Sequence, residues 1–224
     1  MLVTFEGIEG SGKSSQAELL FSWLREQGMD PLLSLEPGGS SLGRELRRIL
    51  LDAGNTELTD EAELFLYLAD RAQHVAQVLR PSLNQGRPVI VDRYIDSTLA
   101  YQGYGRGVHP EHIPELNRLA TQGVLPDLTF LLDLEAETGL RRARQRNAQD
   151  GASQSEGRFE AQELEFHRRV RQGYLEMADR EPERVLRLDA ELPVQEIQSE
   201  IRRILKERFS LGDVAGAHFT ATRR

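Results

Sequence analysis

A glycine-rich segment near the start of the chain carries residue types that bind phosphate. Residues 7–14 read G-I-E-G-S-G-K-S and match G-x-x-x-x-G-K-[ST] at every fixed position. Glycines let the backbone curl so that several N–H groups converge on phosphate oxygens. An unliganded turn is the weaker alternative, because the segment follows a predicted strand and precedes a predicted helix. The spacing predicts an ATP phosphate site made of Gly7, Ile8, Glu9, Gly10, Ser11, Gly12, Lys13 and Ser14.

Lys13 and Ser14 would carry the polar chemistry of this loop. The ammonium group would neutralise the β- and γ-phosphates, and the hydroxyl would ligate Mg²⁺. Lys13 and Lys206 are the only lysines in a chain that otherwise uses arginine. Phosphate contact in such a loop favours a compact ammonium on a flexible stem. The motif predicts a phosphate site but does not identify the reaction.

Two apolar segments end in a carboxylate. Asp92 closes the run V-I-V-D and Asp133 closes L-L-D. A strand-terminal aspartate near the phosphates commonly holds the Mg²⁺ shell. We favour Asp92, because Arg93 follows it and could bridge donor and acceptor phosphates. For Asp133, capping of the helix that begins near Glu135 is the stronger interpretation.

A basic cluster borders the polar segment Asn147–Gly157. Arginines on a closing lid can stabilise the charge of a transferring phosphoryl group while water is excluded. A solvated helix face is the alternative for any single arginine. We expect at least one of the group to face phosphate, with Arg158 as the first choice among Arg141, Arg142, Arg144, Arg146 and Arg158.

Short apolar runs alternate with helix-period stretches along the chain, which is typical of βαβ units and a parallel sheet. The expected strands are Leu2–Glu6, Pro31–Leu35, Pro88–Val91, Leu128–Asp133 and Arg184–Leu188. The expected helices are Lys13–Gln27, Gly43–Leu51, Asp60–Asn84, Pro110–Gly123, Glu135–Arg146, Phe159–Asp179 and Val194–Phe209. This order predicts an α/β P-loop NTPase fold, with a five-stranded parallel sheet, helices on both faces and a short lid at about 141–158. We expect one kinase domain over 1–209 and a flexible tail over 210–224.

Composition limits the functional classes. The 224 residues fit one domain and include no cysteine, which excludes disulfides and thiol nucleophiles. The net charge of −8 argues against a nucleic-acid partner. No apolar run approaches the length of a membrane span, and the first residues lack the features of a signal peptide. We expect a cytoplasmic protein without a membrane partner.

Three stretches resemble bacterial thymidylate kinases. Residues 36–40 read E-P-G-G-S, residues 92–103 read D-R-Y-I-D-S-T-L-A-Y-Q-G, and residues 5–13 give the family form of the P-loop. The second stretch is highly specific. The similarity runs from about Met1 to Phe209 and departs from the family at Leu35, Tyr67 and Gly157, where Arg, Phe and an acidic residue are common.

The resemblance implies ATP and dTMP as substrates, Mg²⁺ as cofactor and a homodimer. It implies catalytic roles for Lys13, Arg93, Arg158 and Glu9, and metal ligation by Ser14 and Asp92. Tyr67 would stack on thymine, Arg71 would read a base carbonyl, and Tyr101 would lie near the sugar. The implied substrate-binding residues are Glu36, Arg47, Tyr67, Arg71, Arg93, Ser97, Thr98, Tyr101 and Gln102.

Two alternatives stay open from the residues. Another nucleoside or nucleotide kinase would share Gly7–Ser14 and differ in the pocket around Tyr67, Arg71 and Tyr101. A nucleotide-dependent switch would use the same fold without an acceptor, because a fold does not fix a function. Dependence of ADP release on a monophosphate separates these classes.

Overall fold

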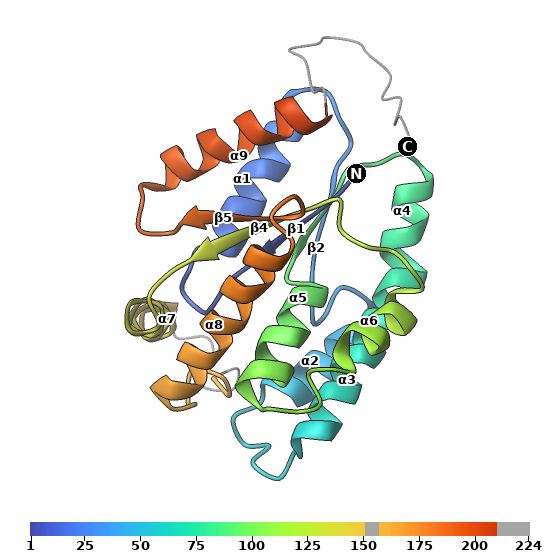
Figure 1. Cartoon of the computed structure of the whole chain (residues 1–224). Coiled ribbons are helices and arrows are strands. Elements are labelled where there is room, and N and C mark those ends of the chain that lie inside the picture. Colours follow the sequence, from blue (N-terminus) through green and yellow to red (C-terminus); the bar gives the residue numbers. More distant parts are fainter. Residues whose placement is uncertain (151–156, 210–224) are drawn as a thin grey trace.

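The computed structural model describes residues 1–150 and 157–209 (Figure 1). Its strands are β1 (Leu2–Glu6), β2 (Leu32–Leu35), β3 (Val89–Asp92), β4 (Leu128–Asp133) and β5 (Val185–Asp189). Its helices are α1 (Lys13–Glu26), α2 (Ser41–Leu51), α3 (Asp60–His74), α4 (Arg80–Asn84), α5 (Ile95–Thr98), α6 (Ile113–Thr121), α7 (Ala136–Asp150), α8 (Leu164–Arg180) and α9 (Val194–Phe209). Two π-helical segments, η1 (Val75–Leu79) and η2 (Leu99–Gly105), complete the order.

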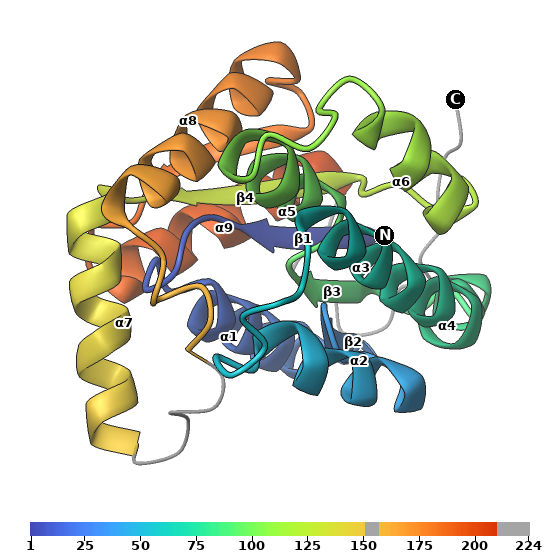
Figure 2. The same cartoon turned by 90° about the horizontal axis from the view of Figure 1, so that it is seen from below.

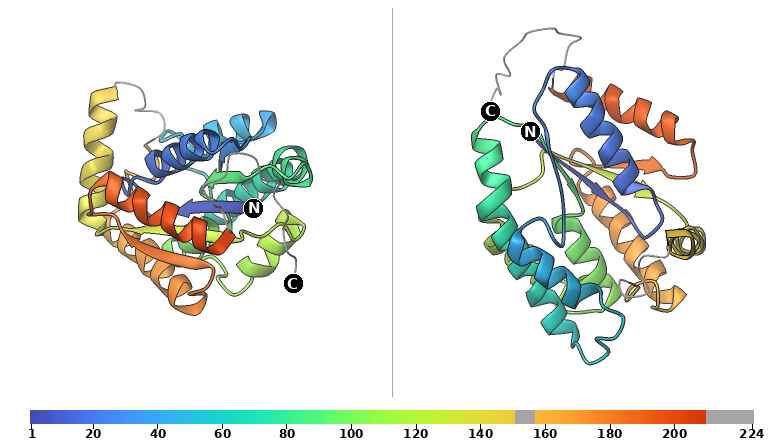
Figure 3. Two further views of the ribbon diagram at one scale, coloured as in Figure 1. Left: turned by 90° about the horizontal axis from the view of Figure 1, so that it is seen from above. Right: turned by 180° about the vertical axis from the view of Figure 1, so that it is seen from behind.

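The five described strands form one parallel sheet in the order β2-β3-β1-β4-β5. β1 is buried along its whole length, because it lies at the centre of the sheet with a helical layer on each face. Helices α1 and α9 pack together on one face, and α8 packs against β4 and β5 on the other (Figures 1 and 3). The predicted α/β fold is confirmed.

The register of the strands brings the predicted site residues to one edge. Phe5 of β1 pairs with Asp92 of β3, and Leu35 of β2 pairs with the same aspartate. Three parts of the site therefore follow neighbouring carboxyl ends of the sheet. The P-loop follows β1, the segment that starts at Glu36 follows β2, and Arg93 follows β3. Helix α7 lies beyond the end toward which β1 and β4 point (Figure 2).

The helix predicted over Asp60–Asn84 is interrupted. The N–H of Arg80 donates to the carbonyl of Val75, which gives the wide turn η1 between α3 and α4. Pro81 explains the wide turn, because its ring has no N–H and would clash with a carbonyl one α-helical turn earlier.

Among the other helices and strands, the largest departures from the predicted boundaries are at the end of α7 and the start of α8. Helix α7 extends to Asp150, four residues into the segment predicted as loop, and α8 begins at Leu164 rather than Phe159. Residues 158–161 form a turn instead, with the N–H of Ala161 bonded to the carbonyl of Gly157 at 3.0 Å. Most of the predicted lid loop, residues 151–156, lies outside the described residues, and so does the whole predicted tail 210–224.

No helix among residues 1–150 and 157–209 is both long and apolar enough to span a bilayer.

Candidate functional site

The P-loop leaves the N-terminal amides of α1 open to a ligand. Gly12 has a φ of 92° and no side chain that could cap the helix, which begins at Lys13. The first N–H groups of a helix have no intrahelical partners, and the dipole end there is positive. A Cβ atom at Gly10 would lie 2.3 Å from the carbonyl oxygen of Gly139, so this position requires glycine. The backbone therefore provides an anion-binding cradle.

Lys13 is buried inside this loop. Its Nζ donates to the carbonyl of Ile8 at 2.7 Å and to Ser11 Oγ at 3.4 Å. Burial and the nearby Arg93 lower the pKa of Lys13 to about 8, although Asp92 and other carboxylates oppose this shift. The ammonium form still predominates at neutral pH, where it can neutralise phosphate.

Asp92 and Ser14 meet at the entrance to the loop. The Ser14 hydroxyl contacts Asp92 Oδ2, while Asp92 Oδ1 is buried without a hydrogen-bond partner in the described chain. Carboxylate and hydroxyl oxygens suit Mg²⁺, which keeps several waters and uses few protein ligands. The donor set and the unpaired oxygen fit the predicted metal site.

Asp133 has a different environment. Its oxygens accept from Arg171 Nε at 2.7 Å and from Arg187 Nη2 at 2.6 Å. These arginines hold the pKa of Asp133 below its usual value despite burial. Asp133, which the sequence made the weaker candidate for a metal ligand, thus forms ion pairs with two arginines.

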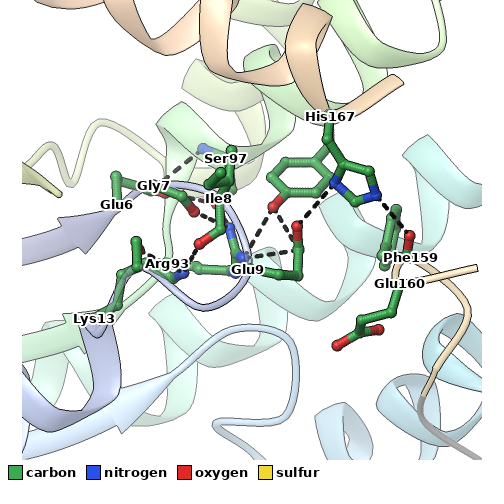
Figure 4. A network of polar contacts seen from close by, with 12 residues as sticks. Glu6, Gly7, Ile8, Glu9, Lys13, Arg93, Ser97, Phe159, Glu160 and His167 are labelled. Carbon is green, nitrogen blue, oxygen red and sulfur yellow. Dashed lines mark hydrogen bonds and ion pairs between the residues drawn. The ribbon is translucent and has the colours of Figure 1, made fainter. Parts of the chain in front are cut away.

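Arg93 is fixed by contacts with the P-loop and with the helical segments α5, η2 and α8 (Figure 4). Its backbone adopts a φ of 67°, which directs the side chain back toward the P-loop. Nη1 donates to the carbonyl of Gly7 at 3.0 Å and to the hydroxyls of Ser97 and Tyr174, each at 3.2 Å. Tyr174 lies on α8 and carried no signal in the sequence. The guanidinium is therefore preorganised before any ligand binds.

Glu9 balances this charge. Its Oε1 accepts from Arg93 Nη2 at 3.0 Å and from the Tyr101 hydroxyl at 2.5 Å. Burial alone would raise the pKa of Glu9, but His167 and the charges of Arg93 and Lys13 hold it well below the usual range. Glu9 is thus a permanent carboxylate at the cavity.

Most of the predicted residues surround one cavity of about 250 Å³. It is lined by Glu9, Gly10, Lys13, Ser14, Glu36, Arg47, Tyr67, Arg71, Asp92, Arg93, Ser97, Thr98, Tyr101 and Gln102. Gly7, Ile8, Ser11 and Gly12 belong to the same loop but do not line the cavity. The cavity therefore joins the phosphate cradle to the predicted acceptor pocket.

Arg71 forms the floor of the acceptor side and is fully buried. Its Nε donates to Glu36 Oε2 at 2.8 Å. Its Nη1 donates to Thr98 Oγ1 at 2.7 Å and to Asn117 Oδ1 at 2.6 Å. Its Nη2 donates to the carbonyl of Tyr94 at 2.9 Å. A guanidinium has five N–H bonds, so one N–H of Nη2 remains for a ligand. Asn117 of α6 was not found from the sequence.

The structure does not bring Arg158 to the cavity. This guanidinium is buried against Glu63 and also donates to the carbonyl of Leu50 at 3.4 Å. Buried Glu63, which the sequence gave no reason to single out, holds it there. Arg146 lines the cavity instead, so the geometry favours a different arginine at the lid.

Asp70 lies beneath the segment that begins at Glu36. Its Oδ1 accepts from the N–H of Gly38 at 3.1 Å, and its Oδ2 is buried without a partner in the described residues. Burial and the charge of Glu36 raise the pKa of Asp70 from 3.8 to about 6. Folding therefore favours the protonated carboxyl, and the stability of the protein falls as pH rises through this range.

We expect Asp70→Asn to stabilise the protein at high pH, because asparagine keeps the acceptor and cannot ionise. The gain in unfolding free energy should reach about 3 kcal/mol above pH 7 and shrink toward pH 4. Urea unfolding at several pH values measures it, with Asp179→Asn at an exposed position of α8 as control. A gain that is the same at pH 4 and pH 8 would contradict the assigned ionisation.

Comparison with known proteins gives a consistent result. A family model described as thymidylate kinase matches residues 5–201. The thymidylate kinase of Oleidesulfovibrio alaskensis is 54% identical over 95% of this chain and 100% of its own length. That of Nitratidesulfovibrio vulgaris is 52% identical over 100% of this chain and 99% of its own. A crystal structure of thymidylate kinase from Ehrlichia chaffeensis has a TM-score of 0.73 and 33% identity, and the match covers 92% of this chain and 98% of that one. The resemblance found in the motifs is confirmed: the chain belongs to the thymidylate kinase family.

Proposed function

We propose that the cavity holds ATP at the P-loop and dTMP against Tyr67, Arg71 and Tyr101. The reaction of the family transfers the γ-phosphoryl group of ATP to dTMP and gives ADP and dTDP. The observation that carries the assignment is that Lys13 and Arg93 open into the same cavity as Tyr67 and Arg71. One cavity thus joins a phosphate-binding loop to a pocket with an aromatic ring and a hydrogen-bond donor.

The acceptor side is built for a thymine base and a deoxyribose. The ring of Tyr67 offers a stacking surface, and burial together with Glu63 raises its pKa, so the phenol stays neutral. The remaining N–H of Arg71 Nη2 would donate to a base carbonyl. The Tyr101 hydroxyl is hydrogen-bonded to Glu9 and Arg93, so the Tyr101 side chain would be held in place beside the sugar.

The transfer itself needs alignment and charge rather than a covalent intermediate. Lys13 would bind the β- and γ-phosphates, and Arg93 would contact the dTMP phosphate beside the transferring group. Glu9 would fix Arg93 and lie next to the acceptor sugar and phosphate. Ser14 and Asp92 would hold Mg²⁺, which when bound neutralises charge on the β- and γ-phosphates.

The lid would contribute a further cation. Arg146 of α7 lines the cavity, and its Nη2 lies 3.8 Å from Glu160 Oε1. Arg47 of α2 also lines the cavity and donates to the carbonyl of Pro37 at 3.0 Å. Arg47 would meet the acceptor phosphate from the opposite side.

The decisive experiment measures ADP release with ATP, Mg²⁺ and a panel of nucleoside monophosphates. Release driven by dTMP well ahead of dUMP supports the proposed pocket. Preference for another monophosphate would leave the P-loop assignment intact and refute the roles of Tyr67, Arg71 and Tyr101. Release that needs no acceptor would refute the proposal for the whole cavity.

The proposed homodimer rests on apolar side chains that helices of the described chain expose. Phe65 of α3 is 60% exposed and Leu119 of α6 is 71% exposed, and these two helices pack against each other. A contiguous apolar patch across adjoining helices is typical of a protein–protein interface, and we propose that these two side chains belong to one.

We expect light scattering of the wild type to give twice the mass of one chain. Phe65→Glu should give the mass of one chain, because a buried carboxylate without a partner opposes association. Leu192→Glu, 46% exposed in the turn between β5 and α9, is the matched control and should stay dimeric. A wild-type monomer at micromolar concentration would refute the dimer.

A further inference from the structure

His167 is a buried polar residue of α8 that has no part in the roles assigned above. Its Nε2 lies 3.1 Å from the carbonyl oxygen of Phe159, and its Nδ1 lies 3.3 Å from Glu9 Oε2 (Figure 4). Both groups belong to other segments: Glu9 to the P-loop, and Phe159 to the turn that precedes α8. The imidazole thus connects three parts of the site.

The contacts of the ring define where its hydrogens must lie. A carbonyl oxygen only accepts, so Nε2 must carry a hydrogen to bond Phe159. The Glu9 carboxylate also only accepts, so a bare Nδ1 would place two lone pairs against each other. Nδ1 and Glu9 Oε2 are both buried, and neither has a hydrogen-bond partner in the described residues, so the two atoms face each other across 3.3 Å.

The two oxygens of Glu9 are divided between different groups. Oε1 accepts hydrogen bonds from Arg93 and Tyr101. Oε2 is buried, has no hydrogen-bond partner in the described residues and makes its one ion-pair contact there with His167. Burying one oxygen of a charged carboxylate without a donor is costly. Without His167, the carboxylate gains most by turning this oxygen toward Arg93, which would draw the guanidinium away from its position.

The same ring also contacts the turn that precedes α8. Phe159 and Glu160 line the cavity, and the Glu160 carboxylate points away from the imidazole (Figure 4). The Phe159 ring packs edge-on against Tyr101, with centroids 5.3 Å apart. The contact from His167 to the Phe159 carbonyl therefore ties α8 to a segment that lines the cavity.

We propose that His167 is a positioning residue for phosphoryl transfer, which acts through Glu9 and joins the P-loop to the turn at Phe159 that precedes α8. This inference rests on the proposed function of the cavity. It assigns His167 no contact with substrate. Its effect should therefore appear in kcat and in the KM for dTMP, while the KM for ATP stays within about twofold.

A double-mutant cycle between His167→Phe and Glu9→Gln tests the coupling. Phenylalanine keeps the ring in its buried site and removes both nitrogens. In the wild-type background we expect kcat/KM for dTMP to fall by about 10- to 100-fold, as for groups that orient a catalytic residue. In the Glu9→Gln background the same change should cost less than about twofold, because the group through which His167 acts is already altered.

Val170→Ala on the same buried face of α8 is the control for a merely structural effect. It should lower kcat/KM equally in both backgrounds if it lowers it at all. If His167→Phe does not fold by circular dichroism, His167→Gln replaces it, since the glutamine amide can still donate to one neighbour. Equal losses from the His167 change in both backgrounds, or no loss in the wild-type background, would overturn the inference. A wild-type enzyme that does not turn over dTMP would instead overturn the proposed function.

Discussion

Arg93→Ala is expected to lower kcat by about a thousandfold or more, which is the usual contribution of an arginine that stabilises a transferring phosphoryl group. The reason is geometric: the guanidinium is already held by Gly7, Ser97 and Tyr174 on one nitrogen and by Glu9 on the other. Such a preorganised cation spends no free energy on reorganisation when charge develops beside it. Its removal should therefore act on turnover rather than on the fold.

The measurement is steady-state ADP release with saturating ATP and dTMP, alongside thermal unfolding. Arg93→Lys keeps the charge but loses the planar fork that joins the P-loop to Glu9, so it should recover only a small part of the rate. Arg203→Ala removes a surface arginine that pairs with Glu200 and Glu207 on α9, and it should leave kcat unchanged. Turnover within tenfold of wild type in Arg93→Ala would refute the assigned role.

The fold followed from local patterns because each pattern has a local cause. Apolar runs such as 2–6 and 128–133 had to be buried on both faces, which the central positions of β1 and β4 provide. The break at η1 was not predicted, because helical periodicity continues through Val75–Leu79 and only Pro81 disturbs it. No element was predicted over residues 95–105, where the structure forms α5 and η2, because neither segment is long enough to give a clear apolar period.

Some residues of the candidate site could be predicted from the sequence and others could not. The P-loop, Asp92 and Arg93 could be predicted because their spacing or their place at a strand end determines their position. Asn117 and His167 could not, since the contact of Asn117 with Arg71 joins two helices and that of His167 with Glu9 joins a helix to the P-loop, each pair far apart in sequence. No periodicity or motif encodes such a meeting.

Arg158 shows the limit of reasoning from charge. Its position after a polar segment suggested a lid arginine, and the resemblance to the family supported that role. The buried carboxylate of Glu63 lies on α3, and this helix is brought to Arg158 only by the tertiary fold. A basic residue near a predicted lid is therefore informative only after its acidic neighbours are known.

The second large effect concerns Lys13, which is expected to be necessary for turnover. Lys13→Ala removes the only cation that the loop itself supplies to the β- and γ-phosphates. Loss of one preorganised charged donor costs about 10²- to 10³-fold in kcat, and we expect at least this loss together with weaker ATP binding. The Nζ contacts with Ile8 and Ser11 are internal to the loop, so the sheet and its helices should remain intact.

The pH dependence of ATP binding gives this prediction a sharper form. Because burial lowers the pKa of Lys13 to about 8, the empty site loses its ammonium as pH rises from 7 to 9. ATP binding by wild type, measured by calorimetry, should weaken over this interval, since the bound phosphates favour the charged form. Lys13→Ala should bind weakly at both pH values and lose that dependence.

Lys206→Ala replaces the only other lysine, on the exposed part of α9, and should keep both the turnover and the pH dependence of wild type. An alanine variant at position 13 that retains the wild-type slope would assign the titration to another group and remove the stated reason for a lysine in the loop.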